Sequence, residues 1–112
     1  MGVIVGTREK QGYERELVFG DADRHHHVYV IGQTGTGKTT LLRNALIQDI
    51  EAGQGVALID PHGDLAEALL DMVPPYRTND VVYFNPADTE YPIGLNPIAK
   101  APPETHHLVI LN

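Results

Sequence analysis

The sequence has no cysteine, no long apolar run and few basic side chains. Without cysteine, disulfides, thiolate metal sites and a cysteine nucleophile are all excluded. No stretch approaches the roughly 18 consecutive apolar residues that a membrane-spanning helix needs. The chain carries 8 Lys and Arg against 15 Asp and Glu, for a net charge of −7. Because binding to nucleic-acid phosphates needs basic side chains, this chain is a poor candidate for wrapping DNA or RNA by itself.

What the sequence does contain is typical of a small soluble domain. Its 112 residues suffice for at most one domain, and 42% of them are hydrophobic and 21% charged. The lack of cysteine fits a reducing compartment. We therefore expect a cytoplasmic location, at the inner face of a membrane if a missing segment or a partner supplies an anchor.

A glycine-rich stretch, VYVIGQTGTGKTTLL at residues 28–42, joins two apolar segments. Within it, residues 32–39 satisfy the phosphate-loop pattern G-x-x-x-x-G-K-[ST] in full. The apolar run at 27–31 predicts a buried strand before the loop. The spacing of apolar residues from Leu41 to Ile50 predicts a helix after it, ending at Gly53. A strand before the loop and a helix after it is the placement that this motif requires.

The loop pattern predicts a site for a nucleoside triphosphate. Successive inward-pointing backbone N–H groups form a concave anion site, and the following helix adds the positive end of its dipole. We expect Lys38 to reach the β- and γ-phosphates, Thr39 to bind Mg²⁺ through its hydroxyl and Thr40 to contact the α-phosphate. The alternative is a glycine-rich turn that caps a helix, with Lys38 solvated. The predicted nucleotide-binding residues are Gly32, Gln33, Thr34, Gly35, Thr36, Gly37, Lys38, Thr39 and Thr40.

A second acidic loop follows in VALIDPHGD, residues 56–64. The pattern predicts a strand ending at Asp60, then a helix over 64–73 with Asp64 as its N-cap and Glu67 three residues on. Asp60 is either a Walker B aspartate near Mg²⁺ or a residue of the strand before the true Walker B strand. We favour the second reading, because only 22 positions separate Asp60 from Lys38.

The catalytic candidates in and around the two loops are Lys38, Asp60 and Asp64. On the favoured reading, a carboxylate of the second loop could orient the attacking water. The alternative is a purely structural role, in which Asp60 makes a turn with Pro61 and Asp64 only caps the helix.

The order of the predicted elements indicates an α/β fold. The runs VIV (3–5) and ELVF (16–19) predict a hairpin or two edge strands with a loose loop between them. Strands and helices then alternate up to a third strand at 81–84, which favours a parallel sheet flanked by helices. We expect an N-terminal β-hairpin over 1–24 and a partial P-loop ATPase domain over 25–112.

With these motifs assembled, residues 24–71 and 81–98 resemble the HerA–FtsK superfamily of motor ATPases. The resemblance is closest to type IV secretion coupling proteins and other conjugative DNA-transfer ATPases. Besides the phosphate loop, it rests on the D-P-H-G-[DE] pattern at 60–64 and on N-P-[IL] at 96–98. It implies a RecA-like fold, usually hexameric, that binds ATP and Mg²⁺ and pumps DNA. Its implied partners are ATP, DNA through the hexamer, further copies of the chain and membrane secretion machinery.

The chain also departs from that family. Asp64 stands where a glutamate is common, which leaves a catalytic role for this position open. The family's later Asp-Glu strand, polar sensor and arginine finger would lie beyond residue 112, and THHLVILN at 105–112 looks like the start of a longer helix. We therefore expect the front part of a longer motor that does not hydrolyse ATP rapidly alone.

Two other classes of function stay open. One is a non-catalytic ATP-binding or interaction module. The other is a different P-loop enzyme such as a small-molecule kinase, which needs a lid with arginines, whereas only Arg43 and Arg77 follow the loop.

Overall fold

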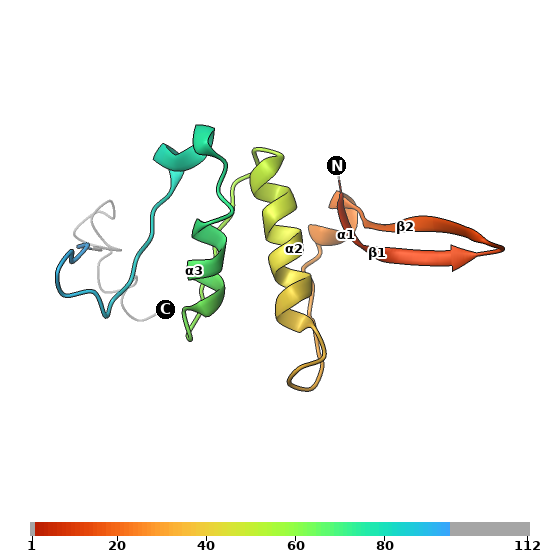
Figure 1. Ribbon diagram of the computed structural model, residues 1–112, viewed down its shortest axis with the longest axis horizontal. Helices are drawn as coiled ribbons and strands as arrows, with labels where there is room; N and C mark the ends of the chain where they lie inside the picture. The colour runs from red at the N-terminus through yellow and green to blue at the C-terminus, as the bar shows by residue number, and fades with distance from the viewer. Residues whose placement is uncertain (1, 95–112) are drawn as a thin grey trace, which may run out of the picture. The chain divides into compact units, whose positions relative to one another are not determined.

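The computed structural model describes residues 2–94. The motif at 96–98 and the helix expected at 105–112 therefore lie outside the described residues. The chain divides into two units, Met1–Asp80 and Val81–Asn112. The helices and strands of the described part all belong to the first unit (Figure 1).

The chain begins with an antiparallel hairpin of β1 (Val3–Lys10) and β2 (Tyr13–Phe19). The register runs from Lys10 opposite Tyr13 to Val3 opposite Phe19, with an irregularity between Ile4 and Gly6. The two linking residues, 11 and 12, have φ values of 56° and 78°. Positive φ at both positions is what a tight hairpin turn of this length requires. The predicted hairpin is confirmed, but its loop is a two-residue turn rather than a loose connection, because both strands are longer than expected.

Helix α2 (Lys38–Glu51) is the longest in the described chain and begins directly after the glycine-rich loop. It ends as predicted at Gly53, which has a φ of 79°. The N–H of Gly53 donates to the carbonyl of Ile50 over 3.1 Å, and that of Gln54 to the carbonyl of Asp49 over 2.9 Å. These paired bonds form a Schellman motif, which satisfies the last carbonyls of the helix.

Three shorter helices accompany α2. They are α1 (Asp21–Arg24), α3 (Asp64–Leu70) and the 3₁₀ helix η1 (Pro75–Asp80). Helices α2 and α3 contact each other and run in the same direction, so their N-terminal ends lie at the same edge of the unit (Figure 1). This is the arrangement expected when each helix follows a strand of a parallel sheet. Within residues 2–94, no helix is both long and apolar enough to cross a bilayer.

The three strands predicted at 27–31, 56–60 and 81–84 are absent from the described residues, where these segments run without a ladder. One large apolar side chain in each segment faces solvent almost fully, with Tyr29 at 88%, Ile59 at 94% and Val82 at 83% exposure. A strand is defined by its partner, and a parallel strand needs backbone pairing together with cover on both faces. The local sequence pattern predicts an apolar segment, but it does not say which segment pairs with it. The predicted parallel sheet is not formed among the described residues.

Candidate nucleotide-binding site

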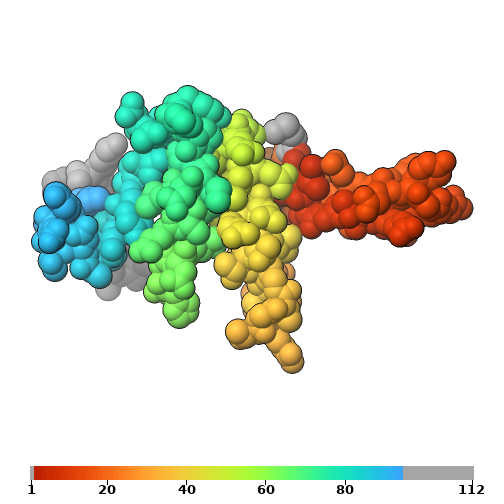
Figure 2. Space-filling view, in the orientation of Figure 1, coloured from red at the N-terminus to blue at the C-terminus, as the bar shows by residue number. Residues whose placement is uncertain are grey.

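The loop between Gly32 and Gly37 is curled and stands open to solvent at the N-terminal end of α2 (Figure 2). The backbone N–H and the hydroxyl of Thr36 both donate to the carbonyl of Gln33, over 3.3 and 2.6 Å. Gly35 and Gly37 have φ values of 82° and 95°, in the left-handed region that other residues rarely adopt. The two glycines therefore permit the curl that the motif predicts.

Lys38 is the first residue of α2, and its side chain folds back across the loop. Its Nζ donates to the carbonyl of Gln33 over 2.7 Å and also to the carbonyl of Gly32. The residue is half-buried, whereas the loop residues before it are exposed. In this structure Lys38 is therefore bonded to the loop rather than extended into solvent. The cation lies over the loop, where an anion bound to the loop would meet it.

The N-terminus of α2 carries no side-chain cap and no acidic residue in its first turn. Its N-cap residue is Gly37, which has no side chain to offer. Thr39 and Thr40 are exposed, and their hydroxyls make no hydrogen bond within residues 2–94. The first N–H groups of a helix attract anions through their unpaired donors and the helix dipole. This end of α2 therefore presents donors and hydroxyls with no carboxylate of its own in competition.

The N-terminus of α3 is arranged in the opposite way. Asp60 Oδ2 accepts hydrogen bonds from the N–H groups of Leu65 and Ala66, over 2.8 and 3.2 Å. The prediction that Asp64 caps this helix is wrong, because Asp64 is its first residue and Gly63 occupies the N-cap position with a φ of 89°. The left-handed turn at Gly63 lets the earlier carboxylate reach the free N–H groups, so Asp60 is the capping residue.

These contacts also set the charge of Asp60. Burial acts to raise the pKa of Asp60, but hydrogen bonds from four backbone N–H groups outweigh it and hold the pKa below its ordinary value. The carboxylate is therefore ionised at neutral pH. Within residues 2–94, neither Asp60 nor Asp64 forms a hydrogen bond or ion pair with the loop 32–40. The four donors are the N–H groups of Ala66, His62, Gly63 and Leu65.

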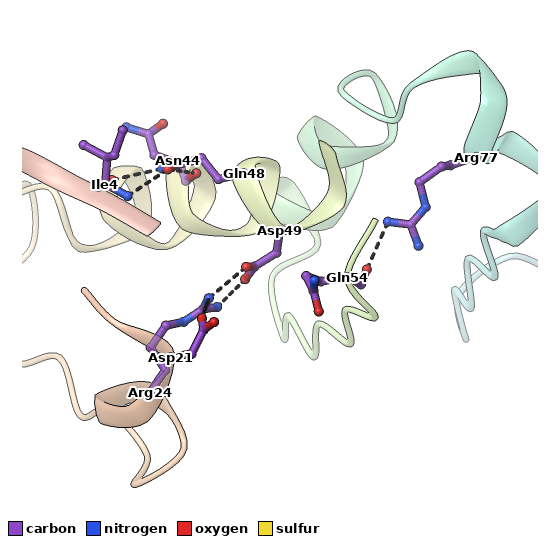
Figure 3. A network of polar contacts seen from close by, with 8 residues as sticks. All are labelled: Ile4, Asp21, Arg24, Asn44, Gln48, Asp49, Gln54 and Arg77. Atoms are coloured by element: carbon purple, nitrogen blue, oxygen red, sulfur yellow. Dashed lines mark hydrogen bonds and ion pairs between the residues drawn. The ribbon is translucent and has the colours of Figure 1, made fainter. Parts of the chain in front are cut away.

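Helix α2 is fixed to the N-terminal segment by Gln48 and Asp49, two side chains that no sequence motif had marked (Figure 3). The carboxamide of Gln48 accepts from the N–H of Ile4 over 2.8 Å and donates to its carbonyl over 2.9 Å. Arg24 donates to both oxygens of Asp49, and the bond from Nη1 is 2.9 Å long. Asp49 is only 8% exposed, and its hydrogen bond raises the pKa of Arg24 further above its usual value. The one signal in the sequence was a pair of polar residues between the apolar Ile47 and Ile50.

The C-terminal end of α2 is covered by residues of η1. Arg77 Nη1 donates to the carbonyls of Ile50 and Gln54, over 2.8 and 3.0 Å, and the Tyr76 hydroxyl donates to the carbonyl of Glu51 over 3.0 Å. A cation at this end also suits the helix dipole. Helix α2 is therefore held at its C-terminal half, and its N-terminal end is left open beside the loop.

No group of three or more His, Cys, Asp or Glu side chains within residues 2–94 could hold a metal ion.

Comparison with known proteins adds one finding. A family model described as "Helicase HerA, central domain" matches residues 20–112, which is well over half of the chain. No curated protein matches the chain, and no solved structure does. The match covers the whole curled loop, helix α2 and the second acidic loop. The chain belongs to the HerA helicase central-domain family.

Proposed function

We propose that this chain binds ATP with Mg²⁺ through residues 32–40 and is the nucleotide-binding front part of a DNA-translocating motor. The observation that carries the proposal is the position of the Lys38 amine. It lies on the carbonyls of a curled loop directly before a helix that has no capping side chain. Membership of the HerA family supports the coarser part, an ATPase related to helicases.

Different residues of the loop contact different parts of the bound nucleotide. The backbone N–H groups of Gly35 and of residues 37–40 bind phosphate oxygens, since the helix start leaves them without a carboxylate partner. Lys38 exchanges its two carbonyl acceptors for the β- and γ-phosphates, and Thr40 contacts the α-phosphate. Thr39 fits a magnesium ligand, because its hydroxyl is exposed and makes no hydrogen bond within the described residues. When bound, Mg²⁺ neutralises charge on the phosphates.

The finer parts of the proposal concern the assembled motor. In it, the segments 27–31, 56–60 and 81–84 pair as parallel strands of a RecA-like sheet, which would cover their exposed apolar side chains. The common direction of α2 and α3 supports this arrangement. Asp60 or Asp64 then orients the attacking water, and DNA passes through a hexamer in conjugative transfer or a HerA-like process. The hairpin over 1–24 precedes the ATPase part in the chain and is held to α2 by Gln48 and Asp49.

Calorimetric titration with Mg-ATP tests the binding step. Lys38→Ala removes a charge-assisted contact to phosphate, which should weaken ATP binding by at least about tenfold. Lys10→Ala is the matched control, since Lys10 ends the exposed strand β1 far along the chain from the loop, and it should bind as the parent does. Equal affinity in the parent and Lys38→Ala would overturn the proposal.

A second candidate is an ATP-binding module without hydrolysis. It is favoured by the capping role of Asp60, since both of its oxygens already accept backbone hydrogen bonds. Phosphate release by a full-length version of the protein, which carries the rest of the motor, separates the two functions when it is measured with and without added DNA. Release that rises with DNA and disappears in Lys38→Ala supports the motor. Tight ATP binding with no release in either condition supports the module.

A further inference from the structure

A groove runs beside the phosphate loop, between strand β1 and one face of helix α2. Its volume is about 750 Å³, which lies in the range of small-molecule sites. Strand β1 contributes Ile4, Val5, Gly6 and Thr7, and the helix side contributes Gly37, Thr40, Leu41, Asn44, Ile47 and Gln48.

The groove is continuous with the loop, because Gly37 and Thr40 line both. Residues Thr40, Asn44 and Ile47 are four and three positions apart, so they share one face of the helix. At 1.5 Å per residue, Asn44 lies about 6 Å further along the axis than Thr40. Thr40 is the residue expected beside the α-phosphate, which is the phosphate that carries the ribose and base of a nucleotide. The groove therefore begins where the non-phosphate half of the ligand must begin.

We propose that this groove holds the purine base and ribose of the bound nucleotide, with Asn44 reading the edge of the base. The inference rests on the proposed function. The Asn44 side chain is exposed and makes no hydrogen bond among residues 2–94, although its backbone carbonyl accepts one from Gln48 over 3.1 Å. A carboxamide has two donors and one acceptor group, and it pairs with the amino and ring nitrogens of adenine in a bidentate way.

The remaining walls suit a flat, largely apolar ring. Val5 comes from the strand, while Leu41 and Ile47 come from the helix, so apolar side chains approach from both sides. The distance between the walls is fixed by Gln48, whose carboxamide bonds to both the N–H and the carbonyl of Ile4 (Figure 3). The hairpin thereby acquires a role in nucleotide binding, as one wall of the base site.

The test compares ATP with inorganic tripolyphosphate, each titrated with Mg²⁺ present. Gly6 lines the groove, and a Cβ there meets no atom within 4 Å, so Gly6→Phe adds a ring at this wall without a clash. It should weaken ATP binding by at least about tenfold, and Asn44→Ala should do so by at least about 2- to 10-fold through the lost hydrogen bonds to the base. Binding of tripolyphosphate should not change in either variant. Gly55→Phe is the matched control, since Gly55 is equally open and lies outside the groove.

Each other outcome has a definite reading. Unchanged ATP affinity in both variants, or equal affinity of the parent for ATP and tripolyphosphate, overturns the base site and leaves the phosphate loop intact. A parallel loss of both ligands also overturns it, since the loop itself would then be affected. A loss in Gly6→Phe alone supports the groove and overturns the role of Asn44. If the parent chain binds neither ligand, the proposed function and the base site fail together.

Discussion

Removing the guanidinium of Arg24 should destabilise the fold far more than removing any exposed charge. Arg24 donates to both oxygens of Asp49, which is 8% exposed. In Arg24→Met, that carboxylate stays buried without its partner. Hydrogen bonds to charged groups contribute about 1.5–3 kcal/mol, and breaking a fully buried pair costs about 3–5 kcal/mol. Because the Arg24 side chain is 29% exposed, we expect a loss of about 2–3 kcal/mol.

Urea unfolding followed by far-UV circular dichroism measures this loss. Replacing both partners, as in Arg24→Met with Asp49→Leu, leaves no buried charge and should recover most of the stability. The matched control is Arg43→Met on α2, the helix that carries Asp49, because the Arg43 side chain is exposed and makes no hydrogen bond within residues 2–94. The reasoning is refuted if Arg24→Met loses less than about 0.5 kcal/mol, or if the control loses as much.

Three further changes probe the loop, the cap of α3 and the hairpin contact. A Cβ at Gly32 would lie 2.6 Å from the Thr36 hydroxyl oxygen. Gly32→Ala should therefore distort the curl of the loop and weaken Mg-ATP binding in a titration. Unchanged affinity would count against the curl. The pKa of Asp60 lies below its ordinary value, so its stabilising contribution is complete above the unfolded pKa of about 3.9 and is lost as the pH falls through the folded pKa. In Asp60→Asn, the free energy of unfolding should therefore fall less steeply as the pH is lowered. An unchanged acid dependence would show that Asp60 does not stabilise α3 as its cap. Gln48→Ala deletes both side-chain hydrogen bonds to Ile4. The loss should lower the free energy of unfolding by about 1–2 kcal/mol and speed hydrogen exchange of the Ile4 amide. Unaltered exchange would show that Gln48 does not hold the hairpin.

The sequence was sufficient wherever the signal is local. The phosphate-loop pattern, the apolar spacing from Leu41 to Ile50 and the glycine at 53 lie within about two dozen residues, and together they predicted helix α2 and its end correctly. The hairpin was also predicted, but its extent was not, because polar residues near the turn hid the length of both strands. Hydrogen bonding between neighbouring strands needs no apolar side chain, so polar strand ends leave little trace in a hydropathy pattern.

One local prediction failed because it depends on backbone geometry. Two aspartates lie near the start of α3, and the spacing favoured Asp64, whereas the left-handed turn at Gly63 gives the cap to Asp60. The other failures arise where distant residues decide. The contacts of Gln48 and Asp49 reach partners 44 and 25 residues away, and no periodicity encodes them. The predicted strands share this cause, since pairing is a property of two segments and a hydropathy pattern describes only one.

The most direct test of the central claim observes the amides of the loop themselves. Proton–nitrogen correlation spectra of the labelled chain, recorded as Mg-ATP is added, report each backbone N–H separately. If the loop cradles the phosphates, the amide signals of Gly35, Gly37, Lys38 and Thr39 shift furthest, and the same titration of Lys38→Ala leaves them in place. Signals at 32–40 that stay still while ATP binds elsewhere, or do not move at any ATP concentration, would contradict the account.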